Sequence, residues 1–215
     1  MKITSIVRNA ILPISVFSGA LVFSSCATSY LSNLWVDPAY QSGSMKNVLV
    51  IAVNKNAENR RIWETGFASE LGKHGVTVTP SYQIFPKDLP DTNQVIEATK
   101  DKGYDGVITI SRLATERVTT YVPGYVMAMP YYAPYRWHRG YFMFYDQMYH
   151  TGYLETSRVV RHEVNVWTTG EGGHMIWTGI GEVIDPSSVK QVNHEIVELV
   201  VPELTKKKII PPEKE

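Results

Sequence analysis

The chain has 215 residues, 21 Lys and Arg against 21 Asp and Glu, and 44% hydrophobic residues. This neutral balance supplies no basic patch of the kind that binds nucleic acid, so we expect no nucleic-acid partner. The only cysteine, Cys26, excludes an internal disulfide, and the six histidines do not occur in pairs at ligand spacing. We therefore expect neither a metal nor another cofactor.

Residues 1–25 have the layout of a bacterial lipoprotein signal peptide. Lys2 and Arg8 form a basic start, an apolar run covers 10–23, and two serines precede Cys26. The run is shorter than the roughly 20 residues that cross a bilayer. We expect cleavage before Cys26 and acylation of its sulfur. The alternative is an ordinary secretory signal cleaved near Ser25, which would leave Cys26 as a free thiol.

Acylation at Cys26 predicts attachment to a membrane, because two or more acyl chains hold a protein stably. Ala27 stands where an aspartate would retain a Gram-negative lipoprotein in the inner membrane. If the source is Gram-negative, we expect the periplasmic face of the outer membrane. Residues 26–45 are then a lipidated tether and a lead-in strand.

The next segments predict a parallel beginning to the sheet. The β-branched run at 48–53 is typical of a strand covered on both faces. Trp63, Phe67 and Leu71 recur every four residues and indicate an amphipathic helix that ends before Gly75. A short strand at 76–79, a helix at 91–102 stopped by Gly103 and a strand at 106–113 follow.

The last third predicts antiparallel pairing. Val160, His162, Val164 and Val166 alternate with polar residues, and 169–173 form a turn into a strand at 175–183. His162 is more simply a buried histidine with its hydrogen bonds satisfied than a catalytic base. Glu163 and Glu182 could oppose each other across this hairpin.

Asp185 and Pro186 predict the start of the last helix, as acceptor and first helical residue. Its apolar face would carry Val189, Val192, Ile196 and Leu199, and Pro202 would kink or end it. The tail from Lys206 is polar and predicted to fray. The fold class is thus α/β (α+β), one domain over 46–204 with a polar tail at 205–215. We expect a mixed sheet of about five to six strands and about three helices.

An aromatic-rich insertion at 121–153 interrupts this domain and contains nine of the thirteen tyrosines. A connection of this length is either functional or disordered. It could bind a partner through rings and arginines, or it could only cover the edge of the sheet. The hypothetical partner-binding residues are Tyr125, Tyr131, Tyr132, Tyr135, Arg136, Trp137, Arg139, Tyr141 and Tyr145.

Several segments together resemble a known group: 48–53, 71–75, 105–108, 167–170 with 175–177, and the Asp185-Pro186-Ser187 sequence. They look like uncharacterised bacterial envelope lipoproteins whose α/β domain is similar to the amino-terminal domain of TolB, and to the penicillin-binding-protein activator and curli-secretion lipoproteins. The resemblance implies a periplasmic, non-enzymatic module that binds a partner or assembles at the outer membrane. We expect the partner to be an envelope protein or the cell wall. The alternatives are a periplasmic enzyme acting on wall glycan or lipid, and a structural lipoprotein that self-associates.

Overall fold

The structure is a computed structural model that describes residues 29–41, 43–126, 149–170 and 173–213. Its strands are β1 (Ser29–Val36), β2 (Asn47–Val53), β3 (Thr77–Pro80), β4 (Gly106–Val122), β5 (Tyr125–Val126), β6 (Tyr149–His150), β7 (Tyr153–Thr168) and β8 (Met175–Ile184). Its helices are α1 (Ala57–Lys73), α2 (Ser81–Ile84), α3 (Thr92–Lys102) and α5 (Val189–Lys206).

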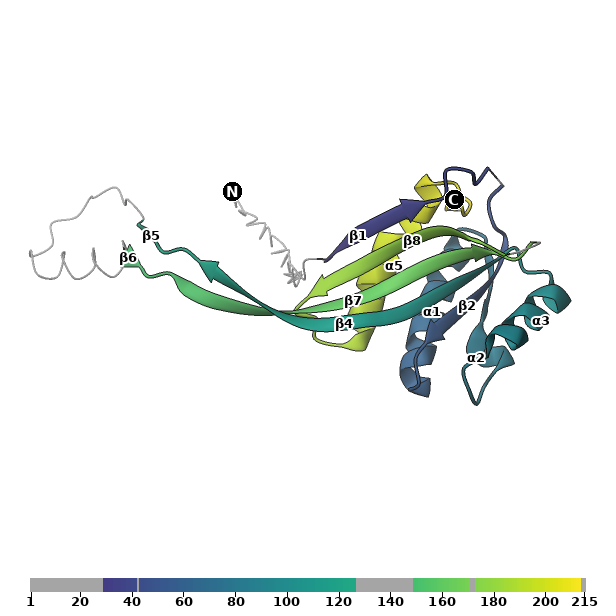
Figure 1. Ribbon diagram of the computed structural model, residues 1–215, viewed down its shortest axis with the longest axis horizontal. Coiled ribbons are helices and arrows are strands. Elements are labelled where there is room, and N and C mark those ends of the chain that lie inside the picture. Colours follow the sequence, from purple (N-terminus) through teal and green to yellow (C-terminus); the bar gives the residue numbers. More distant parts are fainter. Residues whose placement is uncertain (1–28, 42, 127–148, 171–172, 214–215) are drawn as a thin grey trace, which may run out of the picture.

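The described strands form a six-stranded mixed sheet in the order β1-β8-β7-β4-β2-β3 and a two-stranded sheet of β5 and β6. In the larger sheet β2 runs parallel to β3 and β4, and the other neighbours are antiparallel. Helices α1 and α5 pack on one face of it, with α2 and α3 at the β2–β3 end (Figure 1). The predicted α/β fold class is confirmed.

Strand β2 is the centre of the core because both of its faces are covered. Val48, Val50 and Ala52 join the main hydrophobic cluster with α1 and α5. Leu49 and Ile51 belong to a smaller cluster with Tyr104 and Val107. The predicted two-sided burial is therefore confirmed for 48–52.

Local capping signals place the first long helices. Trp63, Phe67 and Leu71 of α1 are buried, as their spacing predicts. Asp91 and Gln94 form a reciprocal capping box at the start of α3, and Gly103 ends it with a φ of 60°. Both helices match the segments predicted from the sequence.

The predicted start of the last helix is wrong. Helix α5 begins at Val189 behind Ser188, whose side chain caps the amide of Gln191. Asp185 instead adopts a left-handed φ of 50° and accepts a hydrogen bond from the Arg158 amide at 2.6 Å. Asp185 thus ends the β7–β8 ladder and cannot also begin the helix.

At the end of the chain two expectations are wrong, namely that α5 could end at Pro202 and that the tail frays. Helix α5 continues beyond Pro202 to Lys206, and Pro202 lies on its exposed side, where an unpartnered carbonyl can bind water. The tail does not fray over 207–211. Ile209 and Ile210 are buried, and the Ile209 carbonyl accepts a hydrogen bond from the Met45 amide at 2.8 Å. The apolar pair holds the tail against the core.

Strands β4 and β7 extend far beyond the segments predicted for them. A register shift between Arg112 and Ala114 bends β4, which then continues to Val122. Beyond Ile184, the last paired residue of β8, residues 117–122 of β4 and 153–158 of β7 pair only with each other. We call these two segments the arm. It projects from the body of the protein (Figure 1).

Candidate functional site

Most residues of the predicted site lie outside the described part of the chain. This applies to Cys26 and to all the hypothetical partner-binding residues from Tyr131 to Tyr145. Only the backbone of Tyr125 is described, where β5 pairs with His150 of β6. What the structure shows is the support: the arm leads from the body to β5 and β6, between which 127–148 are inserted.

The far end of the arm is apolar and exposed on both faces. Tyr121 lies opposite Leu154, and these side chains are 62% and 70% exposed. Val122 lies opposite Tyr153, which is also exposed. Nearer the body the pairs are polar or charged, such as Thr119 with Thr156 and Arg117 with Arg158. The sequence analysis assigned Tyr121 and Tyr153 to the aromatic-rich insertion, whereas the structure places them on the paired strands β4 and β7.

A cluster around Glu182 fastens β1 to the sheet. The buried Glu182 carboxylate accepts hydrogen bonds from the Tyr30 hydroxyl at 3.0 Å, the Ser32 hydroxyl at 2.6 Å and Arg161 Nε at 2.8 Å. Burial alone would raise the pKa of Glu182, but these hydrogen bonds outweigh it and hold the pKa below its usual value. Arg161 also pairs with Glu116 of β4 at 2.5 Å.

The expected opposition of two glutamates is wrong. Glu182 lies opposite Arg161, and Glu163 lies opposite Ile180. A β-strand register cannot be read from one strand alone, because a shift of one residue changes the face of every side chain. The available sequence signal was that Glu182 is the only acidic residue in a strand of otherwise small and apolar residues, which indicates a partner for its charge.

A buried ion pair lies within α1, between Arg60 and Glu64, and its carboxylate also binds the segment after β3. The fully buried Glu64 carboxylate accepts from Arg60 Nε at 3.0 Å, the Ser81 hydroxyl at 2.5 Å and the Ala52 and Tyr82 amides at 3.0 and 2.8 Å. The carboxylate therefore has a full set of partners. The sequence analysis missed it, although opposite charges four residues apart on one helix were visible.

His162 is buried, as its alternating pattern predicts, but its hydrogen bonds are not satisfied. Its ring lies 4.2 Å from that of Trp63, centroid to centroid, and Nδ1 has no hydrogen-bond partner. Burial, helped by the charge of Arg112, lowers the pKa of His162 to about 4. The side chain lies between the sheet and α1, not in the pocket described next.

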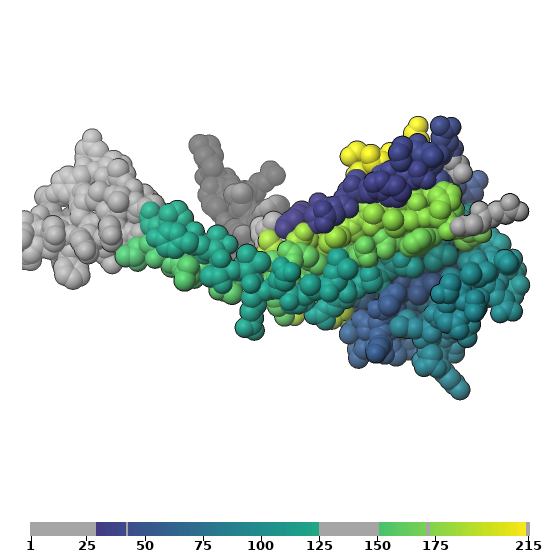
Figure 2. Space-filling model, viewed as in Figure 1, coloured from purple at the N-terminus to yellow at the C-terminus, as the bar shows by residue number. Residues whose placement is uncertain are grey.

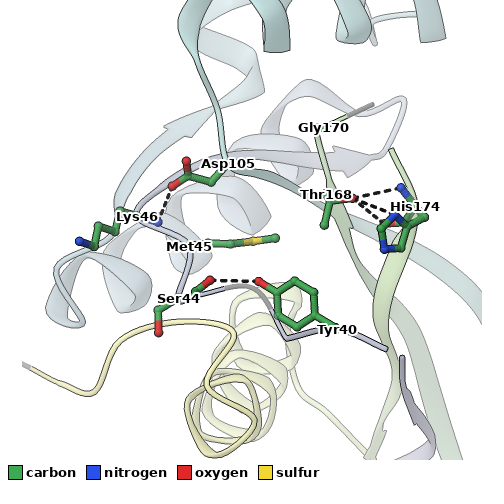
Figure 3. A pocket seen from close by; sticks show the side chains of 9 residues that line it. Tyr40, Ser44, Met45, Lys46, Asp105, Thr168, Gly170 and His174 are labelled. Carbon is green, nitrogen blue, oxygen red and sulfur yellow. Dashed lines mark hydrogen bonds between the residues drawn. The ribbon is translucent and has the colours of Figure 1, made fainter. Parts of the chain in front are cut away.

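An open pocket of about 570 Å³ lies at the end of the sheet away from the arm (Figure 3). Several of its polar groups are engaged in hydrogen bonds with their surroundings. The Asp105 carboxylate accepts from the Lys46 and Asn47 amides at 2.7 and 2.8 Å, and His174 Nδ1 is 3.3 Å from the Thr168 hydroxyl. Asp105 and His174 lie on opposite sides (Figure 3). The lining residues are Tyr40, Gly43, Ser44, Met45, Lys46, Asp105, Thr168, Gly170 and His174.

Among residues 29–41, 43–126, 149–170 and 173–213, no three His, Cys, Asp or Glu side chains gather as metal ligands would. In the same part of the chain, no helix combines the length and the apolar character that crossing a membrane requires.

No family model matches the chain, and no curated protein matches it. Among solved structures it is similar to a PelC dodecamer from Paraburkholderia phytofirmans, with 12% identity, 86% of this chain and 99% of that chain covered, and a TM-score of 0.44. It is also similar to lipoprotein GNA1162 from Neisseria meningitidis, with 15% identity, 75% and 99% coverage, and a TM-score of 0.39. Likenesses this remote say nothing about function, and the resemblance to TolB and its relatives stays a prediction.

Proposed function

We propose that this protein is a lipid-anchored lipoprotein of the bacterial envelope that works as a non-enzymatic binding or assembly module. In a Gram-negative cell it would be attached to the periplasmic face of the outer membrane. The observation that carries the proposal is the arm, which leads away from the body to β5 and β6, and the aromatic sequence of 127–148, with Arg136 and Arg139, is inserted between these two strands. The anchor rests on the signal-like sequence before Cys26.

The marginal stability of an isolated two-stranded ribbon favours a function for the arm. Two strands without a third strand or a helix beside them are marginal in water, because they bury little apolar surface. In the arm both faces stay open, and Tyr121 and Leu154 remain largely exposed. Tyrosine, tryptophan and arginine are the side chains that dominate binding surfaces. A presented binding surface accounts for both the length of the arm and the composition of the segment that it carries.

The polar clusters of the body support a scaffold role. Glu182 fastens β1 to β7 and β8, Glu64 fastens α1 to the segment after β3, and Asp105 fixes the chain before β2. Each carboxylate is occupied by several donors. A group used in this way stabilises the fold and is poorly placed to move protons in a reaction.

The anchor is tested by labelling with a fatty-acid analogue and by intact mass. The native protein should carry acyl chains on Cys26 and sediment with membranes. The Cys26→Ala variant should lose the label and keep residues 1–25, because the lipoprotein peptidase requires the modified cysteine. A mature protein cleaved near Ser25 with an unmodified thiol would refute the anchor.

The binding role is tested by crosslinked affinity purification from the protein's own envelope. One variant replaces 127–148 with a short Gly-Ser turn and keeps the arm. The matched control, Ile96→Ser, changes an exposed apolar residue of α3. A partner lost with the first variant and retained with the second supports the proposal. Identical partners in all three samples would contradict it, and loss of a defined oligomer of this chain alone would favour the self-associating alternative.

A further inference from the structure

We propose that the protein lies lengthwise on the membrane, with the outer side of β1 and the far end of the arm in contact with lipid. This inference rests on the acylation of Cys26 put forward above. Its independent basis is where the described chain begins, which is beside the base of the arm and not at either end of the molecule (Figure 1).

The register of the sheet fixes the position of the anchor along the long axis of the molecule. Ser29 pairs with Val183, Val183 with Val160, and Val160 with Thr115. These residues therefore form a line across the sheet just before the arm begins. Only residues 27 and 28 separate Cys26 from Ser29. An extended chain can span at most about 11 Å over that distance, so Ser29 must lie close to the membrane surface.

The molecule extends in both directions from this line. The body follows β1 toward Val36 on one side, and β4 continues from Thr115 to Val122 on the other. At the usual rise of a strand, the second distance is about 24 Å. The arm thus reaches well beyond the anchor. Because the anchor lies between the body and the arm, raising either one drives the other toward the bilayer. The long axis therefore lies along the surface.

The two parts that this geometry brings to the membrane, β1 and the far end of the arm, carry exposed apolar and aromatic residues. Strand β1 is the edge of the sheet, and Figure 2 shows it along one margin of the body, with the arm continuing beyond. Tyrosine and tryptophan favour the headgroup region because each combines an apolar ring with a polar group. The exposed residues are Tyr30, Leu34 and Trp35 on β1 and Tyr121, Tyr153 and Leu154 on the arm.

A second copy of the chain fits this edge less well than lipid does. Pairing with another strand requires a straight edge, and bulges are a common means of preventing it. The ladder of β1 shifts register between Ser32 and Trp35, and Asn33 has a left-handed φ of 48°. The edge is therefore irregular at its middle, while its apolar side chains remain available to a fluid surface.

The test uses single-cysteine probes on the full-length acylated protein. Acylated Cys26 leaves no free thiol, since it is the only cysteine. Trp35→Cys and Leu154→Cys place a thiol on β1 and on the arm, at side chains that are 44% and 70% exposed. Ile96→Cys is the matched control, at an apolar side chain of α3 that is 47% exposed and lies away from β1 (Figure 1). Each is labelled with the fluorophore NBD and reconstituted in vesicles of phosphatidylethanolamine and phosphatidylglycerol.

We expect a blue shift of NBD emission and loss of intensity to a doxyl-labelled lipid at positions 35 and 154, and neither at 96. Equal quenching at all three positions, or none at 154, would overturn the lengthwise orientation. Probes that are protected from aqueous iodide but not quenched by lipid would overturn the lipid contact and indicate that a second copy of the chain covers these residues. Intact mass separates the two proposals: an unmodified Cys26 refutes the anchor, whereas acylated Cys26 with unquenched probes refutes only the lipid contact.

Discussion

Acidification should destabilise this protein through His162 before its low-pKa carboxylates take up protons. The imidazole has an ordinary pKa of 6.5, and burial beneath Trp63, with the charge of Arg112, lowers the pKa to about 4 in the fold. As pH falls below 6.5, the unfolded chain binds a proton that the folded chain does not, so stability falls. The loss is about 1.4 kcal/mol per pH unit and reaches about 3 kcal/mol near pH 4, below which both states are protonated and the loss levels off.

Urea unfolding of the mature chain at a series of pH values measures this loss. The His162→Leu variant removes the titrating ring and its unpartnered Nδ1 while keeping an apolar side chain of similar size. The difference in unfolding free energy between wild type and variant isolates His162 from the other histidines. Parallel curves for the two proteins between pH 6.5 and pH 4 would refute the reasoning, because they would mean that His162 titrates alike in both states.

Two further predictions concern stability and use urea unfolding at neutral pH. Glu64→Ala should lower the free energy of unfolding by about 3–5 kcal/mol, because it leaves the buried Arg60 guanidinium without its partner. The control Glu70→Ala breaks a surface pair and should lower it by less than about 1 kcal/mol. Equal losses in the two variants would contradict this prediction. Gly103→Ala should cost about 1 kcal/mol, because φ is 60°, whereas Gly72→Ala in helical backbone should stabilise by about 0.5 kcal/mol. An added Cβ meets no atom within 4 Å at either glycine, so changes of the same sign would refute the backbone explanation.

The elements that could be predicted are those whose signals are local. A continuous apolar run rich in β-branched residues is sufficient to indicate β2. The acceptor at Asp91 and the glycine at 103 are sufficient to bound α3. The predicted start of α5 was wrong because Asp185 bonds with Arg158 at the end of the β7–β8 ladder, and this contact cannot be seen without the strand register. Ile209 and Ile210 were overlooked because two apolar residues in a polar tail form no period.

The arm shows a different limit of sequence reasoning. Residues 117–122 and 153–158 are exposed or half-buried on both faces, so they lack the alternation that marks a strand on a core. Their strand structure comes from pairing with each other. The aromatic composition of the insertion was evident, but the projecting ribbon that leads to it depends on a pairing that no single segment encodes.

The antiparallel docking of β1 on β8 has a mechanical consequence. In the lengthwise orientation, a force on a lipid anchor at Cys26 that acts along the membrane surface would pull on Ser29 along the axis of β1. Tension in that direction loads the ladder from Ser29 to Val36 in shear, so its hydrogen bonds share the force instead of opening one after another. The hydrogen bonds from Tyr30 and Ser32 to Glu182 lie near Ser29, at the end of β1 to which the force is applied. An edge strand joined in this way could carry envelope tension into the centre of the sheet without unzipping.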